Sequence, residues 1–333
     1  MRTCAFVLAL LALLAAGCRE RPSDSATPTQ TQSEQEAIGG FGDEDVALSG
    51  RVQVDGSSTV APLVTLAAEQ FRKQEPKVKV TVGVSGTGGG FERFCAGETD
   101  LSNASRRIEP EERAACGKKR IQYRELQVAN DGLSVVVSPS TDWVDCLTVE
   151  QLKKIWEPGS KVKTWRDVDP SFPDKKLELF GPGTDSGTFD YFTDAIVGEE
   201  GASRSDYSAT EDDNVIVNGV SGGDAGLGYL GLSYVEENQG KLKPLGIDAG
   251  DGCVEPSVQT VQDGTYKPLS RPLFVYATVN ALEDKDQVSA FLTFLLDHER
   301  ALARKALFVP LTDDQLNKAQ TVLEGAGSDS GSE

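Results

Sequence analysis

The sequence predicts an α/β protein built from two lobes. Stretches in which apolar residues alternate with polar ones give way repeatedly to stretches with helical spacing, which indicates strands followed by helices. Loops rich in serine, threonine and glycine separate the two patterns. Apart from its two ends, the 333-residue chain has about 280 residues, enough for two lobes of ordinary size rather than one.

The individual elements follow from these patterns in chain order. Alternating or short continuous apolar runs predict strands at residues 52–54, 78–84, 99–104, 121–128, 133–137, 177–180, 227–232 and 273–279. Helical spacing predicts helices that begin near residues 60, 91, 148, 189, 287 and 312, with the one from 287 continuing to 307. Thr148 and Gln151 form a capping-box pattern at the start of one of them.

The two ends of the chain differ from the rest. Residues 1–17 are typical of a secretory signal, and the stretch before Cys18 resembles a bacterial lipobox. We expect cleavage before Cys18 and acylation of that residue, with a plain signal peptide as the alternative. Residues 18–46 predict a disordered tether and residues 326–333 a disordered tail. The protein is thus expected to be exported, periplasmic or at the cell surface, and anchored to a membrane by lipid.

The charge balance excludes one class of partner. The chain has 33 Lys plus Arg against 52 Asp plus Glu, a net charge of −19. Nucleic acid is therefore not expected to bind. A small anion can still be held, because a local cage of N–H groups and hydroxyls acts at short range.

The cysteines indicate disulfides. Removal of the signal and acylation of Cys18 leave four of the six: Cys95, Cys116, Cys146 and Cys253. An even number in an exported chain favours two disulfides, for which three connectivities are possible. A zinc site is a poor alternative, because no pair has CxxC spacing and the chain has one histidine.

Three loops suggest a binding site for an oxyanion. In each, a predicted strand ends, Ser, Thr and Gly follow, and a predicted helix begins; the loops are 56–60, 85–90 and 181–188. Free backbone N–H groups at a helix start and neighbouring hydroxyls are suitable donors for a tetrahedral oxyanion. In an open α/β sheet such loops gather at the carboxyl ends of the strands. An Arg-bearing turn at 105–107 adds a fourth element.

These motifs, in this order, resemble the PstS family of phosphate-binding proteins. The segments that carry the resemblance are GSSTVAPL (56–63), SGTGGGFERFCAGETD (85–100), NASRRI (103–108), GTDSGTFDYF (183–192) and GDAGLGYL (223–230). The resemblance implies a type II periplasmic-binding-protein fold, with two α/β lobes, a two-strand hinge and phosphate in the interlobe cleft. It further implies a monomer that binds inorganic phosphate with high affinity and delivers it to the membrane permease of an ABC transporter.

The resemblance also implies where the lobes divide. With the crossing strands near 132–138 and 270–277, lobe I covers 47–135 and 272–325 and lobe II covers 136–271. The pairing of Cys95 with Cys116 and of Cys146 with Cys253 is then favoured, because each pair lies within one lobe.

The site residues can be transferred position by position. The family's donor loops match Ser58, Thr59, Thr87 and Gly88 in lobe I and Ser186, Gly187 and Thr188 in lobe II. Two positions differ, since well-known members have Asp where this chain has Ser105 and Arg where it has Pro182.

These differences affect how phosphate would be distinguished from sulfate. Phosphate keeps a P–O–H donor at neutral pH, so an acceptor in the site favours phosphate over sulfate. Either the Ser105 hydroxyl or another acid, with Asp185 nearest in sequence, could accept that proton. Arg106 could replace the missing arginine, because a guanidinium can hold two oxygens at once. Arg106 and Arg107 should point to opposite sides of an extended segment, and we favour Arg106.

Other functions find less support in the sequence. Residues 226–231 fit GxGxxG, but they follow no predicted strand, so a dinucleotide site is not expected. His298 lies in an apolar-faced helix and is expected to face solvent. A phosphate-ester hydrolase would need metal ligands or an activated nucleophile, and we expect neither an enzyme nor a cofactor. Sulfate, molybdate or tungstate is the main alternative ligand.

Overall fold

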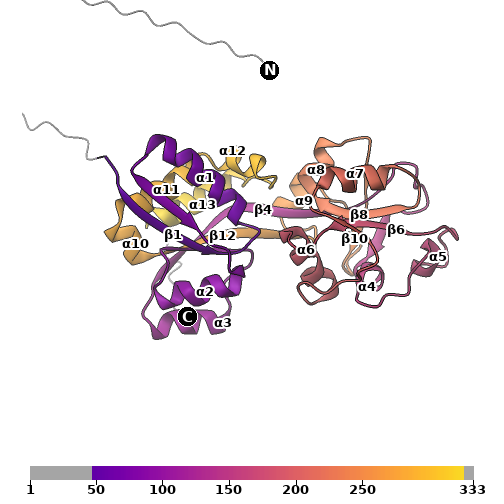
Figure 1. The fold of residues 1–333 in the computed structure, drawn as a ribbon, viewed down its shortest axis with the longest axis horizontal. Helices are drawn as coiled ribbons and strands as arrows, with labels where there is room; N and C mark the ends of the chain where they lie inside the picture. The colour runs from indigo at the N-terminus through magenta and orange to yellow at the C-terminus, as the bar shows by residue number, and fades with distance from the viewer. Residues whose placement is uncertain (1–46, 326–333) are drawn as a thin grey trace, which may run out of the picture. The chain divides into compact units, whose positions relative to one another are not determined.

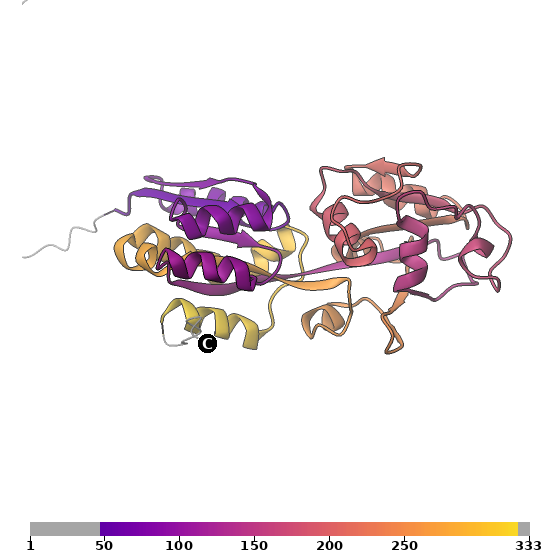
Figure 2. The same cartoon turned by 90° about the horizontal axis from the view of Figure 1, so that it is seen from below.

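The computed structural model describes residues 47–325 (Figures 1 and 2). The expected signal, the lipidation site at Cys18, the tether and the tail lie outside the described residues. The helices and strands alternate as the sequence indicates, and the α/β fold class is confirmed.

The strands are β1 Gly50–Gly56, β2 Val78–Val82, β3 Leu101–Ala104, β4 Tyr123–Val137, β5 Cys146–Thr148, β6 Glu178–Pro182, β7 Ser208–Thr210, β8 Gly226–Gly231, β9 Lys243–Pro244, β10 Gly246–Asp248, β11 Cys253–Val254 and β12 Ser270–Thr278. The helices are α1 Ala61–Gln74, α2 Gly86–Ala96, α3 Pro110–Lys118, α4 Val149–Trp156, α5 Trp165–Val168, α6 Gly187–Phe192, α7 Asp213–Ser221, α8 Leu232–Glu237, α9 Val258–Gln262, α10 Val279–Asp284, α11 Asp286–Asp297, α12 Glu299–Lys305 and α13 Asp313–Leu323. One π-helical turn, Thr193–Val197, continues α6.

Strand β4 joins two halves of one sheet, whose order is β2-β1-β3-β12-β4-β8-β6-β7. Its first part pairs antiparallel with β12, and its last five residues pair antiparallel with β8. The expected strands 121–128 and 133–137 are therefore one strand of 15 residues. Both halves find a hydrogen-bonding partner, so the Gly132 between them does not end the strand.

Each half of the sheet lies between two layers of helices (Figure 1). Apolar side chains fill the space between the sheet and the helices on both faces. In the first lobe α1, α11 and α13 cover one face, and α2 and α3 cover the other. In the second lobe α7 and α8 cover one face, and α4 and α6 cover the other. The two-lobe fold is thus confirmed, while the residue at which each lobe begins and ends stays a prediction.

Long aromatic side chains fill these cores. Phe71 of α1 meets Phe291 and Phe294 of α11 with ring centroids 5.5 and 5.4 Å apart. In the second lobe the fully buried Trp156 of α4 packs edge-on against Tyr229 of β8 at 4.9 Å. Burying a side chain of this size stabilises the fold by about 1.5–3 kcal/mol.

Each of the two disulfides joins two elements of the same lobe. Cys95 of α2 is bonded to Cys116 of α3. Cys146 of β5 is bonded to Cys253 of β11, at opposite edges of the three-stranded sheet β11-β10-β5. The favoured connectivity is confirmed.

Two sequence expectations differ from the structure. The glycine-rich segment after β2 is not a loop, because α2 already begins at Gly86. The expected helix 287–307 is interrupted at His298, whose Nδ1 and backbone N–H both donate to the carbonyl oxygen of Phe294, at 2.9 and 3.1 Å. As expected, the GxGxxG sequence lies in a strand, β8, and not in a turn between strand and helix. This removes the geometry that a dinucleotide site requires.

Just beyond that interruption, a buried acid supports the segment between α12 and α13. Glu299 is 1% exposed, and its Oε1 accepts the backbone N–H of Leu311 at 2.9 Å. Burial raises the pKa of Glu299 from its usual 4.5 to about 7, although Leu311, Arg300 and Arg304 oppose this shift. The folded protein therefore binds a proton more tightly than the unfolded chain, and stability falls as the pH rises from about 4.5 to about 7.

We expect Glu299→Gln to flatten this pH dependence, because glutamine keeps the acceptor for Leu311 without a buried charge. Urea unfolding at pH 4.5, 6 and 8 should show the variant gaining on the wild type as the pH rises, by up to about 3 kcal/mol. The exposed Glu283→Gln is the control and should show no such trend. Parallel curves for Glu299→Gln and the wild type would contradict the role of this carboxyl.

Candidate functional site

A cavity of about 520 Å³ opens between the two lobes. It is lined from the first lobe by Ser57, Ser58, Thr59, Ser85, Gly86, Thr87, Gly88, Ser105 and Arg106, and otherwise by Asp190, Tyr191, Asp194, Glu200, Pro268, Ser270 and Arg271. Six of the ten residues expected to bind phosphate are among them. The other four, Asp185, Ser186, Gly187 and Thr188, are not.

Parallel pairing brings the first-lobe segments together. Strand β1 lies between β2 and β3, parallel to both, so their carboxyl ends meet at one edge. The backbone N–H of Ser57 donates to Asn103 (2.9 Å), and that of Ser85 donates to Gly56 (3.2 Å). Gly56 permits this approach, since a Cβ there would lie 2.2 Å from the Asn103 carbonyl oxygen. Residues separated by almost 50 positions therefore share one wall of the cavity.

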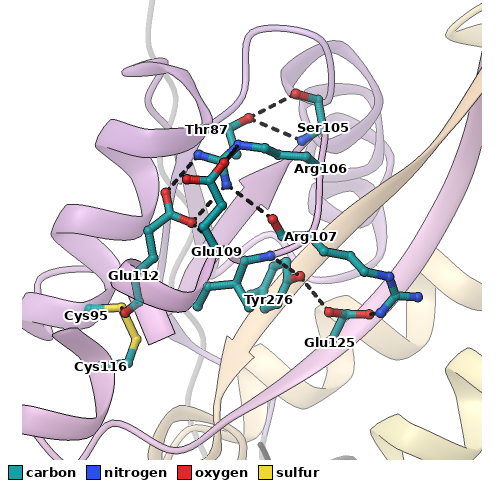
Figure 3. A network of polar contacts seen from close by, with 11 residues as sticks. Thr87, Cys95, Ser105, Arg106, Arg107, Glu109, Glu112, Cys116, Glu125 and Tyr276 are labelled. Atoms are coloured by element: carbon teal, nitrogen blue, oxygen red, sulfur yellow. Dashed lines mark hydrogen bonds and ion pairs between the residues drawn. A yellow bond between two sulfur atoms is a disulfide. The ribbon is translucent and has the colours of Figure 1, made fainter. Parts of the chain in front are cut away.

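Thr87 and Ser105 connect two of these segments (Figure 3). The hydroxyl of Thr87 accepts the backbone N–H of Ser105 at 3.2 Å and lies 3.0 Å from the Ser105 hydroxyl. The two side chains fix each other's orientation while they line the cavity. Hydroxyls of this kind can donate to an anion.

The neighbouring arginines point to different sides, as the sequence predicts (Figure 3). Arg106 lines the cavity, but its guanidinium makes two 2.8 Å bonds to Glu112 and lies 3.3 Å from Glu109. Arg107 pairs with Glu125 instead. The bonds to Glu112 raise the pKa of Arg106, so this residue stays charged while its charge is largely balanced.

The second-lobe loop approaches the first lobe at Thr59. Ser186 caps α6 by accepting the N–H of Thr188 at 3.2 Å, whereas Asp185 is exposed. A Cβ placed on Gly187 would lie only 2.8 Å from Oγ1 of Thr59. The backbone of this loop thus lies against the first-lobe donor loop although it does not line the cavity.

The sequence reasoning missed Arg271, a cation on the crossing strand β12. Its Nε donates to Asp131 of β4 at 3.2 Å, and its Nη2 donates to Thr59 Oγ1 at 3.0 Å. Its guanidinium carbon lies 3.6 Å from the ring centroid of Tyr191. The only sequence signal for Arg271 was its position in the expected crossing strand 270–277. The alternation of residues within a strand does not show which residues of other segments face it.

Three acidic side chains, Asp190, Asp194 and Glu200, were also missed and line the second-lobe side. Burial raises the pKa of Asp190, Glu200 raises it further, and Arg271 opposes the change. Burial likewise raises the pKa of Asp131, which Arg271 again opposes. The cavity therefore combines hydroxyl donors, two arginines and carboxylates that can accept hydrogen bonds.

Within residues 47–325, no three His, Cys, Asp or Glu side chains gather in a way that could hold a metal ion. The helices of the same region include none that is long and apolar enough to cross a membrane.

The chain is similar to known proteins. A profile described as a PBP superfamily domain matches residues 23–299. The protein SphX of Synechococcus elongatus is 50% identical over 263 residues, which cover 78% of this chain and 77% of SphX. The phosphate-binding protein PstS of Staphylococcus saprophyticus is 40% identical over 290 residues, covering 86% and 89% of the two chains.

A solved structure shows the same fold. The crystal structure of a possible phosphate-binding protein from Planctomyces limnophilus is 44% identical, with a TM-score of 0.80. The match covers 84% of this chain and 99% of the other. These findings confirm the resemblance drawn from the motifs. The chain belongs to the PBP superfamily and, within it, to the family of the PstS and SphX proteins.

Proposed function

We propose that the protein binds inorganic phosphate in the interlobe cavity. The observation that carries this proposal is the gathering of serine and threonine hydroxyls from three parallel strand ends opposite a wall that contains Arg271. Relatives with 40–50% identity include one named phosphate-binding protein, and the similar crystal structure is described in similar terms. Neutral hydroxyl and N–H donors beside a guanidinium suit a small oxyanion.

The proposed ligands come from both lobes. Ser58, Thr59, Thr87, Gly88, Ser105 and Arg106 would bind from the first lobe, and Asp185, Ser186, Gly187 and Thr188 would complete the site from the second. The position of Gly187 against Thr59 supports an arrangement in which the two sets meet around one anion.

The carboxylates favour phosphate over other oxyanions. Asp190, Asp194 and Glu200 would repel an anion that has no proton to donate, such as sulfate or molybdate. Phosphate retains at least one P–O–H group at neutral pH and can donate it to a carboxylate. Asp190 lines the cavity and Asp185 does not, so Asp190 is the better candidate for the acceptor.

We further propose a role in transport rather than catalysis. The binding-protein names of the relatives support a carrier that passes phosphate to the permease of an ABC transporter. Export with a lipid anchor at Cys18, and a monomeric state, belong to the same proposal. Hydrolysis of phosphate esters is the alternative to be tested.

Calorimetry with phosphate, sulfate and molybdate at pH 6 and pH 8 tests the ligand. We expect tight, saturable phosphate binding with one site per chain and at least a 100-fold weaker response to sulfate, since each unmatched buried polar contact costs about 1–3 kcal/mol. Tight sulfate binding that phosphate cannot displace would contradict the proposal. Steady release of phosphate from a phosphate ester would move the protein to the enzyme class.

Gly187→Ala tests the meeting of the two donor loops. The added methyl would come within 2.8 Å of Thr59 Oγ1 and 3.2 Å of its Cα, so the loops must separate. We expect the phosphate Kd to rise about tenfold, since overpacking costs about 1–3 kcal/mol. Gly117→Ala in α3 is the matched control, because its methyl would meet no atom within 4 Å. An unchanged Kd in Gly187→Ala would show that this contact is not part of the bound state.

A further inference from the structure

We propose that Arg271, more than Arg106, is the cationic ligand of the anion and supplies the guanidinium that is absent at Pro182. This inference rests on the proposed phosphate function, which it makes more specific. It concerns the crossing strand β12 and therefore a part of the chain outside all the donor loops.

The first step is the charge balance of the two arginines in the cavity. Arg106 is already engaged by Glu112 through two bonds and by Glu109, and its side chain is 38% exposed. Arg271 forms an ion pair with one carboxylate, Asp131, and its side chain is 16% exposed. The carboxylate of Asp190 acts on it electrostatically without forming an ion pair. A cation with one partner in a less solvated position attracts an added anion more strongly than one shared between two carboxylates.

The second step is the supply of free donors. A guanidinium has five N–H groups. Arg271 uses one on Asp131 and one on Thr59, and within residues 47–325 its other three have no hydrogen-bond partner. Three N–H groups in one plane are enough to hold two oxygens of a tetrahedral anion.

The third step is the fixed orientation of the side chain. Asp131 is paired with Arg271 across the β4–β12 ladder and holds its Nε. The Tyr191 ring lies 3.6 Å from the guanidinium carbon, and the Tyr191 hydroxyl donates to the Pro268 carbonyl at 2.7 Å. A guanidinium held on one edge and one face loses little freedom when it binds a ligand.

The fourth step is location. Thr59 belongs to the first lobe, Tyr191 to the second, and Asp131 and Arg271 to the strands that connect them. The free guanidinium edge therefore lies where the hydroxyl donors and the acidic wall meet. An anion bound to Arg271 would therefore be connected to both lobes, because this one side chain contacts Thr59 and Tyr191.

The test is phosphate calorimetry on the purified Arg271→Met and Arg106→Met variants. Methionine keeps most of the apolar stem and removes the charge. We expect Arg271→Met to raise the phosphate Kd about 10- to 100-fold, the range for a charge-assisted hydrogen bond, and Arg106→Met to raise it less. The matched control is Arg107→Met. Like Arg271, Arg107 is paired with one carboxylate and lies over an aromatic ring, but it does not line the cavity. Its Kd should stay within twofold of the wild type.

Arg271→Met also leaves Asp131 buried without its partner, which could unfold the protein. The double variant Arg271→Met/Asp131→Asn removes that charge as well and should recover the thermal midpoint of the wild type without recovering affinity. Recovery of the wild-type Kd in the double variant, or a larger loss in Arg106→Met, would overturn the inference. If the unaltered protein binds no phosphate, the proposed function itself fails, and this inference fails with it.

Discussion

The pairing of β4 with β12 is the constraint on which the rest of the structure depends. The ladder begins within the first lobe at Tyr123 and Thr278 and continues to Gly132 and Ser270, beyond which β4 passes into the sheet of the second lobe. Side chains of both strands enter the first-lobe core, and the last residues of β4 enter the second. Two strands thus link two separate cores, which leaves the space between the cores for a ligand.

The same ladder places polar groups at its centre. Asp131 and Arg271 are direct partners in an antiparallel pair, where side chains lie close together on one face of the sheet. A buried ion pair contributes little net stability, because removing two charges from water offsets their attraction. Its position at the crossing, with one edge of the guanidinium toward the cavity, is therefore better explained by binding than by folding.

Much of this arrangement could be predicted from the sequence, because strand alternation, helical spacing and caps are local signals. The capping box at Thr148 is present as expected, and a helix begins after Thr312 as expected. The start of α2 could not be predicted from propensity, since glycine is a poor helix former. The glycines of α2 are explained by packing against β1, because a Cβ at Gly90 would lie 2.5 Å from the Cα of Gly56. Arg271 escaped prediction for a related reason, since its partner Thr59 lies 212 residues away.

An anion site in a chain of net charge −19 is consistent with the electrostatics of short distances. Salt screens exposed charges beyond about 8 Å, so the acidic surface acts weakly on the cavity. In the proposed site, hydroxyls and backbone N–H groups would supply donors without adding charge, and one guanidinium would supply most of the attraction. On the same proposal, the nearby carboxylates would act mainly on ligands that enter their range. They would reject an oxyanion without a proton and accept a hydrogen bond from one that has a proton. Selectivity in such a site comes from the placement of acceptors, while affinity comes from the donors and the buried cation.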